Sequence, residues 1–281
     1  MSLATWIQRG DEVFLNPAKR YVKPHWITTD PEEVIVPANQ QSDAVLMNID
    51  YQGHFEAFYF LYQSTGDFLI SIFDNGTRRL LMNDEIHIAT IAGTAQRPFI
   101  LPESYFFNTE DAGTSLIVKF RDISGANNSI RFAIFGRRFY HKEATPDIQK
   151  KIYEKFGRLE RTNLYFLTTE GGAISLSPGG STRALIRNTD EAETEIFKLT
   201  AVSTGAFKFK MKDSATGRYF MNDYIHSNLA FGNGQYPFIL SGAETLIFVR
   251  NYQAEIEIVD LSGAANTIYL TLTGRRLYHR A

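Results

Sequence analysis

The side chains best suited to chemistry lie in two short motifs, and each motif occurs twice. The first reads Gly-Arg-Arg-x-Tyr-His, at residues 136–141 and again at residues 274–279. An arginine that stacks on a tyrosine and binds a carboxylate or a phosphate would make it a ligand or partner site. The other interpretation, an arginine–tyrosine cluster tying the last strand of a domain to its own sheet or to a second domain, is favoured by its occurring twice. The residues concerned are Arg137, Arg138, Tyr140, Arg275, Arg276 and Tyr278.

Strand parity predicts where these arginines point. Counted from Ile134, an uninterrupted strand would turn Gly136, Arg138 and Tyr140 inward. Unpaired guanidinium groups are not expected in a core. We therefore predict a bulge at the glycine that shifts the register and turns the residues after it outward.

The second motif reads Met-Asn-Asp-x-Ile-His, at residues 82–87 and 221–226. Aspartate and histidine are both metal ligands, but two such groups are not a site, and His87 would have to meet His141 in space. The His-x-His pair of the cupins, which are jelly-roll metalloenzymes, is absent from the sequence. We predict no metal and no cofactor, and a turn in which the Asn and Asp side chains bond to local backbone groups.

Other patterns also give no catalytic assignment. Asp74-Asn75-Gly76 has only part of a calcium loop and reads Asp213-Ser214-Ala215 in its second occurrence, so a hairpin turn is the simpler interpretation. No nucleophile elbow, phosphate loop or dinucleotide fingerprint is present. Asp122 and Asp260 recur, but acid–base catalysis would need a second group close to each in space. We predict that the protein is not an enzyme and has no catalytic residues.

Composition narrows the class of protein further. The chain has 281 residues, of which 44% are hydrophobic and 21% charged, as in an ordinary globular protein. The net charge of −2 gives no electrostatic reason to expect nucleic acid or an anionic membrane as a partner. The absence of cysteine excludes disulfides, cysteine zinc sites and thiol nucleophiles. No apolar run is long enough to predict a membrane-spanning helix, and the first ten residues do not resemble a secretory signal.

The motifs recur because the chain repeats itself at a spacing of about 139 residues. Residues 64–101 match residues 203–240 at 18 of 38 positions without a gap, and residues 122–141 match residues 260–279 at 11 of 20. Solenoid units run to about 20–50 residues, so a period this long indicates two complete domains. We call them copy one and copy two.

Apolar residues alternate with polar ones in almost every segment of both copies. Phe207–Lys212 alternates without error, which is the pattern of a strand with one face on a core and the other in water. Short strands separated by turn residues, without amphipathic helices between them, predict an all-β fold of two antiparallel sandwiches, most simply jelly rolls. The predicted strands are 34–36, 44–49, 55–62, 68–73, 116–121 and 130–134 in copy one, and 174–176, 184–187, 195–202, 207–212, 254–259 and 268–272 in copy two.

The domain boundaries follow from these patterns. We predict an N-terminal arm at 1–25, copy one at 26–142, a helical connector at 143–163 and copy two at 164–281. The connector carries apolar residues at helical spacing after Thr145-Pro146, a good helix start. Trp6 makes the arm a candidate for packing on a neighbour, with an added strand or loop on its own domain as the alternative.

The two copies differ most at positions predicted to face outward. Copy two has lysines and threonines there, whereas copy one has apolar residues at several of the same positions. A contiguous apolar outer face is rarely left in water. We therefore predict that the outer sheet of copy one is covered by another subunit or by copy two, while the lysine-bearing sheet of copy two is solvated or faces an acidic partner. The pairs compared are Leu69, Ser71, Phe73, Ala133 and Phe135 against Lys208, Lys210, Lys212, Thr271 and Thr273.

The whole pattern resembles the small tandem β-sandwich structural proteins of tailed bacteriophage virions. The likeness rests on Pro98–Pro102, Pro237–Leu240 and the two Ser-Gly-Ala…Gly-Arg-Arg segments, and it covers both copies from about residue 26 onward. It implies a virion protein that decorates a head, forms a collar or joins head to tail. Its partners would be other virion proteins or copies of itself, in a homo-oligomer.

A carbohydrate- or receptor-binding protein of a phage tail, or a bacterial lectin, is the alternative from another class. Such a protein would expose Trp or Tyr beside carboxylates. Only Trp6 and Trp26 are present, both near the start and without a Trp counterpart in copy two, which weakens this alternative.

Overall fold

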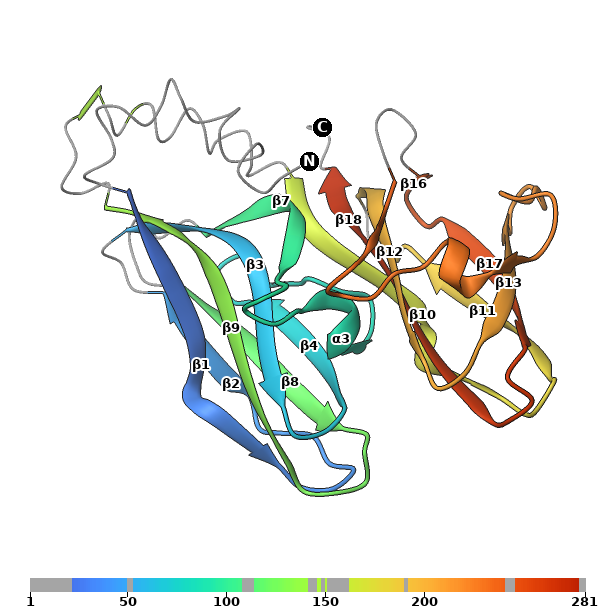
Figure 1. The fold of residues 1–281 in the computed structure, drawn as a ribbon. Coiled ribbons are helices and arrows are strands. Elements are labelled where there is room, and N and C mark those ends of the chain that lie inside the picture. Colours follow the sequence, from blue (N-terminus) through green and yellow to red (C-terminus); the bar gives the residue numbers. More distant parts are fainter. Residues whose placement is uncertain are drawn as a thin grey trace.

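The computed structural model describes residues 22–49, 53–107, 114–140, 146–147, 150, 162–189, 192–240 and 246–277. Within them each copy is a jelly roll, and Figure 1 shows the two side by side, copy one in blue to green and copy two in yellow to red. The strands of copy one are β1 (Val22–Val36), β2 (Val45–Ile49), β3 (His54–Ser64), β4 (Phe68–Asp74), β5 (Arg79–Leu80), β6 (Ile86–His87), β7 (Phe99–Phe107), β8 (Thr114–Asp122) and β9 (Asn128–Phe139).

The strands of copy one form two facing layers. One layer has the order β1-β9-β3-β7 and the other β2-β8-β4, which β5 and β6 extend at its edge. The long β1 joins the layers, because it pairs with β9 along most of its length and with β2 at Asp30. The apolar side chains between the layers make a core that includes Phe68, Ile70 and Ile72 at every second residue of β4.

Copy two repeats this order strand by strand. Its layers are β10-β18-β12-β15 and β11-β17-β13-β14, with β16 also paired to β12. The bounds are β10 (Thr162–Leu176), β11 (Ser181–Arg187), β12 (Glu193–Ser203), β13 (Phe207–Asp213), β14 (Ile225–His226), β15 (Phe238–Ile239), β16 (Leu246–Phe248), β17 (Gln253–Asp260) and β18 (Asn266–Leu277). The prediction of an all-β, jelly-roll-like fold in two antiparallel sandwiches is confirmed.

Two kinds of element were not predicted. The helices α3 (Ile88–Ile91) and η4 (Ser227–Leu229) are single turns, too short to show a helical period. Strands β1 and β10 begin well before the predicted strands 34–36 and 174–176. Each of them continues on the N-terminal side of an irregularity in its pairing, at Thr28/Glu33 in β1 and at Thr168/Ala173 in β10. Prolines in β1 and a glycine pair in β10 hide the earlier halves from a reading based on alternation.

The outer boundaries of the copies are only partly visible. Strand β1 starts at Val22, inside the predicted arm, and β10 starts at Thr162, inside the predicted connector. Trp6 and most of residues 143–161 lie outside the described residues, within which Pro146, Asp147 and Lys150 are helical.

Candidate assembly interface

The two copies meet asymmetrically. Copy one presents α3, the segment before it and the start of β7, and copy two presents the outer face of its β10-β18-β12 layer. Figure 1 shows α3 between the copies. Its counterpart η4 packs on β13 of its own copy. Corresponding segments of the two copies therefore have different surroundings.

The centre of this contact is a phenylalanine of copy two that packs into the core of copy one. Phe166 is completely buried and belongs to the copy one core, as does Leu164. Its ring centroid lies 6.1 Å from that of Phe60 and 6.4 Å from that of Phe99. Burying a phenylalanine stabilises by about 1.5–3 kcal/mol, so this one side chain is a large part of the join.

Backbone pairing surrounds that side chain. Residues 81–83 run parallel to β10 at Phe166: the Phe166 amide donates to the Leu81 carbonyl (2.9 Å) and the Asn83 amide donates to the Phe166 carbonyl (3.2 Å). The Asn83 side chain accepts from the Thr168 amide (2.8 Å) and donates to the Thr168 carbonyl (2.9 Å). Copy one thus adds a short strand to the open edge of copy two.

Polar contacts continue across the threonine-rich face of β18. The hydroxyls of Thr90 and Thr271, both fully buried, lie 2.8 Å apart. The ring of His87 packs on that of Tyr269 at 4.8 Å, and burial lowers the pKa of His87, opposed by Asp67. Thr271 and Thr273 lie on the outer face of their own sheet, as predicted, but both are buried, Thr271 against Thr90 of copy one.

A buried lysine closes the contact at β12. The Nζ of Lys198 donates to the Ile100 carbonyl and lies 4.6 Å from the centroid of the Phe99 ring. Burial lowers the pKa of Lys198 to about 8, because the charged ammonium is removed from water.

The arginines of the paired motif contact their own sheet and the other copy, which is the arrangement described by its second interpretation, but the predicted bulge at the glycine was wrong. Strand β9 alternates without a break through Gly136 and Arg138, so Arg138 faces inward and is 5% exposed; Arg276 is 6% exposed. The bulges lie on the partner strands, between Ala57 and Tyr59 and between Ile196 and Lys198. The glycine is needed because a Cβ on Gly136 would lie 2.0 Å from the Glu56 carbonyl oxygen.

Each arginine of the motif has a partner on a neighbouring strand or ring. Arg137 Nε pairs with Glu56 at 2.6 Å, and Arg275 Nε pairs with Glu195 at 2.8 Å. Arg276 lies 3.4 Å from the centroid of the Tyr165 ring and donates to a carbonyl of copy one, that of Leu80. In copy one Arg138 lies 5.7 Å from the ring of Tyr140, and Tyr278 falls outside the described residues.

The remaining motifs are local turns or contacts between the copies. Asp74 accepts from the amides of Gly76 and Thr77 at the β4–β5 turn, which confirms a hairpin. Asp84 accepts from the next amide, as predicted, but Asn83 beside it bonds to copy two. Among the described residues no group of three or more His, Cys, Asp or Glu side chains is placed to hold a metal ion, and no helix could span a membrane.

The recurring carboxylates organise turns. Burial alone would raise the pKa of Asp122, but hydrogen bonds from the Asn39 amide, the Ser124 hydroxyl and the Asn128 amide group outweigh it and hold that pKa below its usual range. Asp260 has the same arrangement in copy two, where the Ser262 hydroxyl contributes most to lowering its pKa.

The apolar outer positions of copy one do not form the single sheet that we predicted. Leu69 and Phe73 lie on β4 in one layer, and Phe135 lies on β9 in the other, so they belong to opposite faces of the sandwich. All three are half-buried. On the β9 face, Phe135 packs against Trp26 at 4.5 Å and stacks on Tyr59 at 5.5 Å.

This aromatic cluster, Trp26–Phe135–Tyr59, is the counterpart of the face that copy one covers on copy two. By strand register, Trp26 corresponds to Phe166, Phe135 to Thr273 and Tyr59 to Lys198. Trp26 is 57% exposed. No described residue of copy two covers it, and sequence analysis missed it because position 26 was placed at a domain boundary.

Copy two in turn exposes the counterpart of the segment that copy one uses for docking. Leu81 is 1% exposed, whereas its counterpart Phe220 is 42% exposed. Other exposed apolar or aromatic residues in this part of copy two include Tyr219, Leu229, Phe238 and Ile239. Behind them lies an apolar cavity of about 200 Å³, lined among others by Leu199, Phe220, Met221, Ile225 and Leu240.

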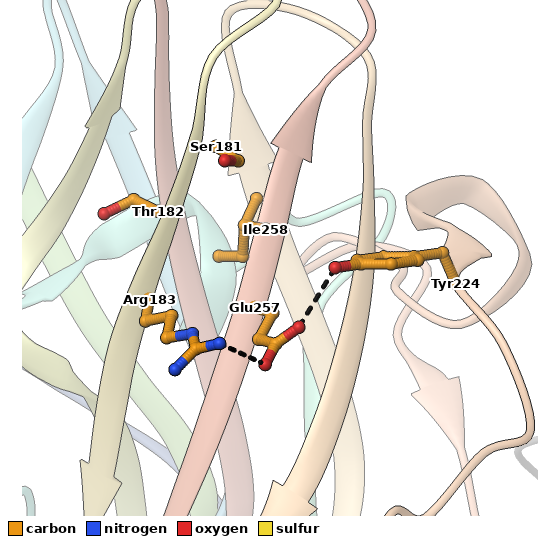
Figure 2. Close-up of a pocket in the computed structure, with 6 residues that line it drawn as sticks. All are labelled: Ser181, Thr182, Arg183, Tyr224, Glu257 and Ile258. Atoms are coloured by element: carbon orange, nitrogen blue, oxygen red, sulfur yellow. Dashed lines mark hydrogen bonds and ion pairs between the residues drawn. The ribbon is translucent and has the colours of Figure 1, made fainter.

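The opposite layer of copy two carries a shallow polar groove of about 300 Å³. Figure 2 shows Glu257 at its centre, bonded to Arg183 at 3.2 Å and to the Tyr224 hydroxyl at 3.0 Å. Ser181, Thr182 and Ile258 complete the lining. The lysines predicted on this face are half-buried, and Lys212 pairs with Glu255 at 2.9 Å.

No protein-family model and no curated protein matches the sequence. Among solved structures, the fold is similar to that of the major capsid protein P2 from bacteriophage PM2, at 11% identity and a TM-score of 0.46, over 92% of this chain and 99% of that chain. A structure described as the triple jelly-roll fold and turret assembly of an archaeal virus is similar at 10% identity and a TM-score of 0.27, over 88% of this chain and 59% of that one. VP2 of infectious bursal disease virus is similar at 8% identity and a TM-score of 0.23, over 92% and 42%. These likenesses concern the arrangement of strands, and the function has to be argued from the residues of this chain.

Proposed function

We propose that this protein is a non-enzymatic structural subunit of a bacteriophage virion, in the head, collar or head-to-tail region, and that it acts through protein–protein interfaces. The observation that carries the proposal is the aromatic cluster Trp26–Phe135–Tyr59, in which Trp26 is 57% exposed and the other two rings are half-buried. It lies on the layer whose counterpart in copy two is already an interface. Monomeric proteins seldom leave such a patch in water, and patches of this kind mark interaction sites. A fused pair of similar domains also suits a symmetric shell or ring.

Charge and chemistry agree with this role. The contacts between the copies are made by apolar side chains, backbone pairing and threonine hydroxyls, which are the means by which subunits hold one another. Two buried titratable groups, Lys198 and His87, lie in that contact.

The test is the composition of particles. Virions of the phage that encodes this chain, purified on a density gradient, should contain it at a constant ratio to the other head or tail proteins, measured by mass spectrometry. Antibody labelling in electron microscopy should place it at one site on the particle. A chain found only in the unassembled fraction would refute the proposal.

The second candidate, carbohydrate or receptor binding, has one specific observation in its favour. The groove around Glu257 brings together a carboxylate, a guanidinium and a tyrosine hydroxyl, which are groups that bind sugar hydroxyls. A glycan array with the intact chain and with Arg183→Ala would decide it. A reproducible sugar signal that the variant loses would favour recognition over assembly.

A further inference from the structure

Each half of the internal contact has a counterpart elsewhere in the molecule, and within the described residues neither counterpart is covered by the other copy. Figure 1 shows β1, in blue, on the side of copy one away from copy two. We propose that copy two of one chain docks on copy one of a second chain, as copy one docks on copy two within the chain. This inference rests on the proposed function and names the partner as a second copy of this protein.

The aromatic side chains fit this arrangement. Within the chain, Phe166 fills the space beside Phe60 and Phe99 in copy one. The counterpart of that space in copy two is the apolar cavity beside Leu199, and the counterpart of the phenylalanine is Trp26. An aromatic ring without a pocket and a pocket without a ring thus stand at matching positions, and we place Trp26 of one chain in the cavity of the next.

The residues beside the ring change together. Where Thr90 meets Thr271 through their hydroxyls, the counterparts are Leu229 and Ala133. Leu229 is 72% exposed, whereas Thr90 is fully buried. A polar pair inside the chain is therefore matched by an apolar pair for the contact between chains, as expected if both contacts form.

Backbone pairing is also available. Strand β1 pairs with β9 in the register in which β10 pairs with β18, so Trp26 and Thr28 direct their backbone groups to an edge that no described strand occupies. Asn222, the counterpart of Asn83, is exposed. Residues 220–222 can pair with this edge as residues 81–83 pair with β10, with the Asn222 side chain on the backbone of Thr28.

The two surfaces are different, so the contact is head to tail. Such contacts close into a ring when the rotation per subunit allows it and continue as a filament when it does not. This arrangement excludes a symmetric dimer through one surface. Variants of the two surfaces should therefore associate only when they are mixed.

Disulfide trapping tests the geometry directly, because the natural chain has no cysteine. A Leu229→Cys chain mixed with an Ala133→Cys chain under mild oxidation should give a covalent dimer on a non-reducing gel, while each variant alone should not. The double variant Thr90→Cys/Thr271→Cys is the internal positive control, because those hydroxyls lie 2.8 Å apart and should give an intrachain bond. Leu261→Cys, at another exposed position, mixed with Ala133→Cys is the negative control.

Association in solution provides an independent readout. Trp26→Glu and Leu229→Glu should each shift the native mass of the full chain to that of a monomer, 31.9 kDa, at concentrations where the natural chain assembles. An equimolar mixture of the two variants should form dimers and nothing larger, because it contains one intact pair of surfaces. Leu261→Glu should assemble like the natural chain.

The outcomes separate this inference from the proposed function. Assembly that survives both Trp26→Glu and Leu229→Glu, or a mixture that stays monomeric, would overturn the head-to-tail contact and leave the virion role standing. A monomeric natural chain, together with Leu229→Cys and Ala133→Cys chains that give no crosslink even within purified particles, would also overturn the contact. Absence from particles together with efficient trapping would refute the virion role alone.

Discussion

Copy one and copy two have the same strand order and share the motif from Met82 or Met221 to the following histidine. Met82, Ile86 and His87 are buried, however, whereas their counterparts in copy two are only half-buried. The difference does not come from the fold of either domain. It comes from the neighbour: copy one has the outer layer of copy two to pack on, and no described residue gives copy two the same cover. The burial of these positions therefore depends on whether a neighbouring domain covers them.

The faces on which these segments pack differ in polarity: the covered face is the more polar one. The covered face of copy two carries Thr168, Thr200, Thr271 and Lys198, whereas the uncovered face of copy one carries the aromatic cluster Trp26–Phe135–Tyr59. A chain that functioned as a monomer would be expected to have the polar set on the uncovered face.

Truncating the ring inside copy one should have the largest effect. Phe166→Ala should lower the free energy of unfolding by about 3–5 kcal/mol, since it opens a cavity in a packed core. Trp26→Ala, at the corresponding exposed position, should cost the monomer about 1 kcal/mol or less, because it loses mainly one ring contact. Urea unfolding at a dilution that keeps both chains monomeric measures the difference. Equal losses would mean that the two positions are not distinguished by burial.

Lys198 should make the contact between the copies pH-dependent. In the folded chain its pKa is lowered to about 8, below the 10.5 of a free lysine, so the folded state disfavours its charge. Unfolding therefore takes up a proton between about pH 8 and 10.5, and the stability contributed by this group rises with pH across that window, by at most about 3 kcal/mol.

The matched variant is Lys198→Met, which keeps the aliphatic stem. The free energy of unfolding of the natural chain minus that of the variant should increase from pH 8 to pH 10.5, and other titrations cancel in this difference. Parallel pH profiles would show that Lys198 is not desolvated by copy one.

The glycine beside the bulged strand occurs in both copies, and replacing it should destabilise both copies equally. A Cβ added at Gly136 or at Gly274 would lie 2.0 or 2.1 Å from the carbonyl oxygen of the bulged strand beside it. Gly136→Ala and Gly274→Ala should therefore each lower the free energy of unfolding by about 1–3 kcal/mol, by overpacking. Denaturant titration of both variants checks this, and an effect confined to one copy would show that the bulges differ.

The same comparison explains what could be predicted from the sequence. The repeat was predictable because it is a direct match between two segments of the sequence. The inward apolar positions, such as Ile268 and Leu270 on β18, were predictable because they follow from alternation within one strand. The position of Arg138 was not, because the bulge lies on β3, where no glycine or proline marks it. The burial of Thr271 was not predictable either, because polarity usually indicates exposure and the residue that covers it, Thr90, is distant in sequence.

The interface itself was only half predictable. Comparing the copies correctly pointed to their outer faces as the place where they differ, and Phe135 lies in the aromatic cluster. Trp26 and Asn83 were missed for one reason: each matters through a residue on the other copy or at the corresponding position, and local patterns carry no information about that.

The smallest effect, and the finest test of the comparison, comes from the asparagines. Asn83 accepts a hydrogen bond from the buried Thr168 amide and donates one to its carbonyl, so Asn83→Ala leaves both backbone groups without that partner. The expected loss is about 1–2 kcal/mol, together with faster hydrogen exchange at the Thr168 amide. Asn222→Ala should leave the monomer unchanged within about 0.5 kcal/mol, because the exposed side chain of Asn222 is solvated. If the chains assemble head to tail, assembly should slow hydrogen exchange at the Thr28 amide. This slowing should be smaller in the Asn222→Ala variant than in the natural chain. Identical behaviour of the two asparagines in the monomer would contradict the difference in surroundings on which the comparison depends.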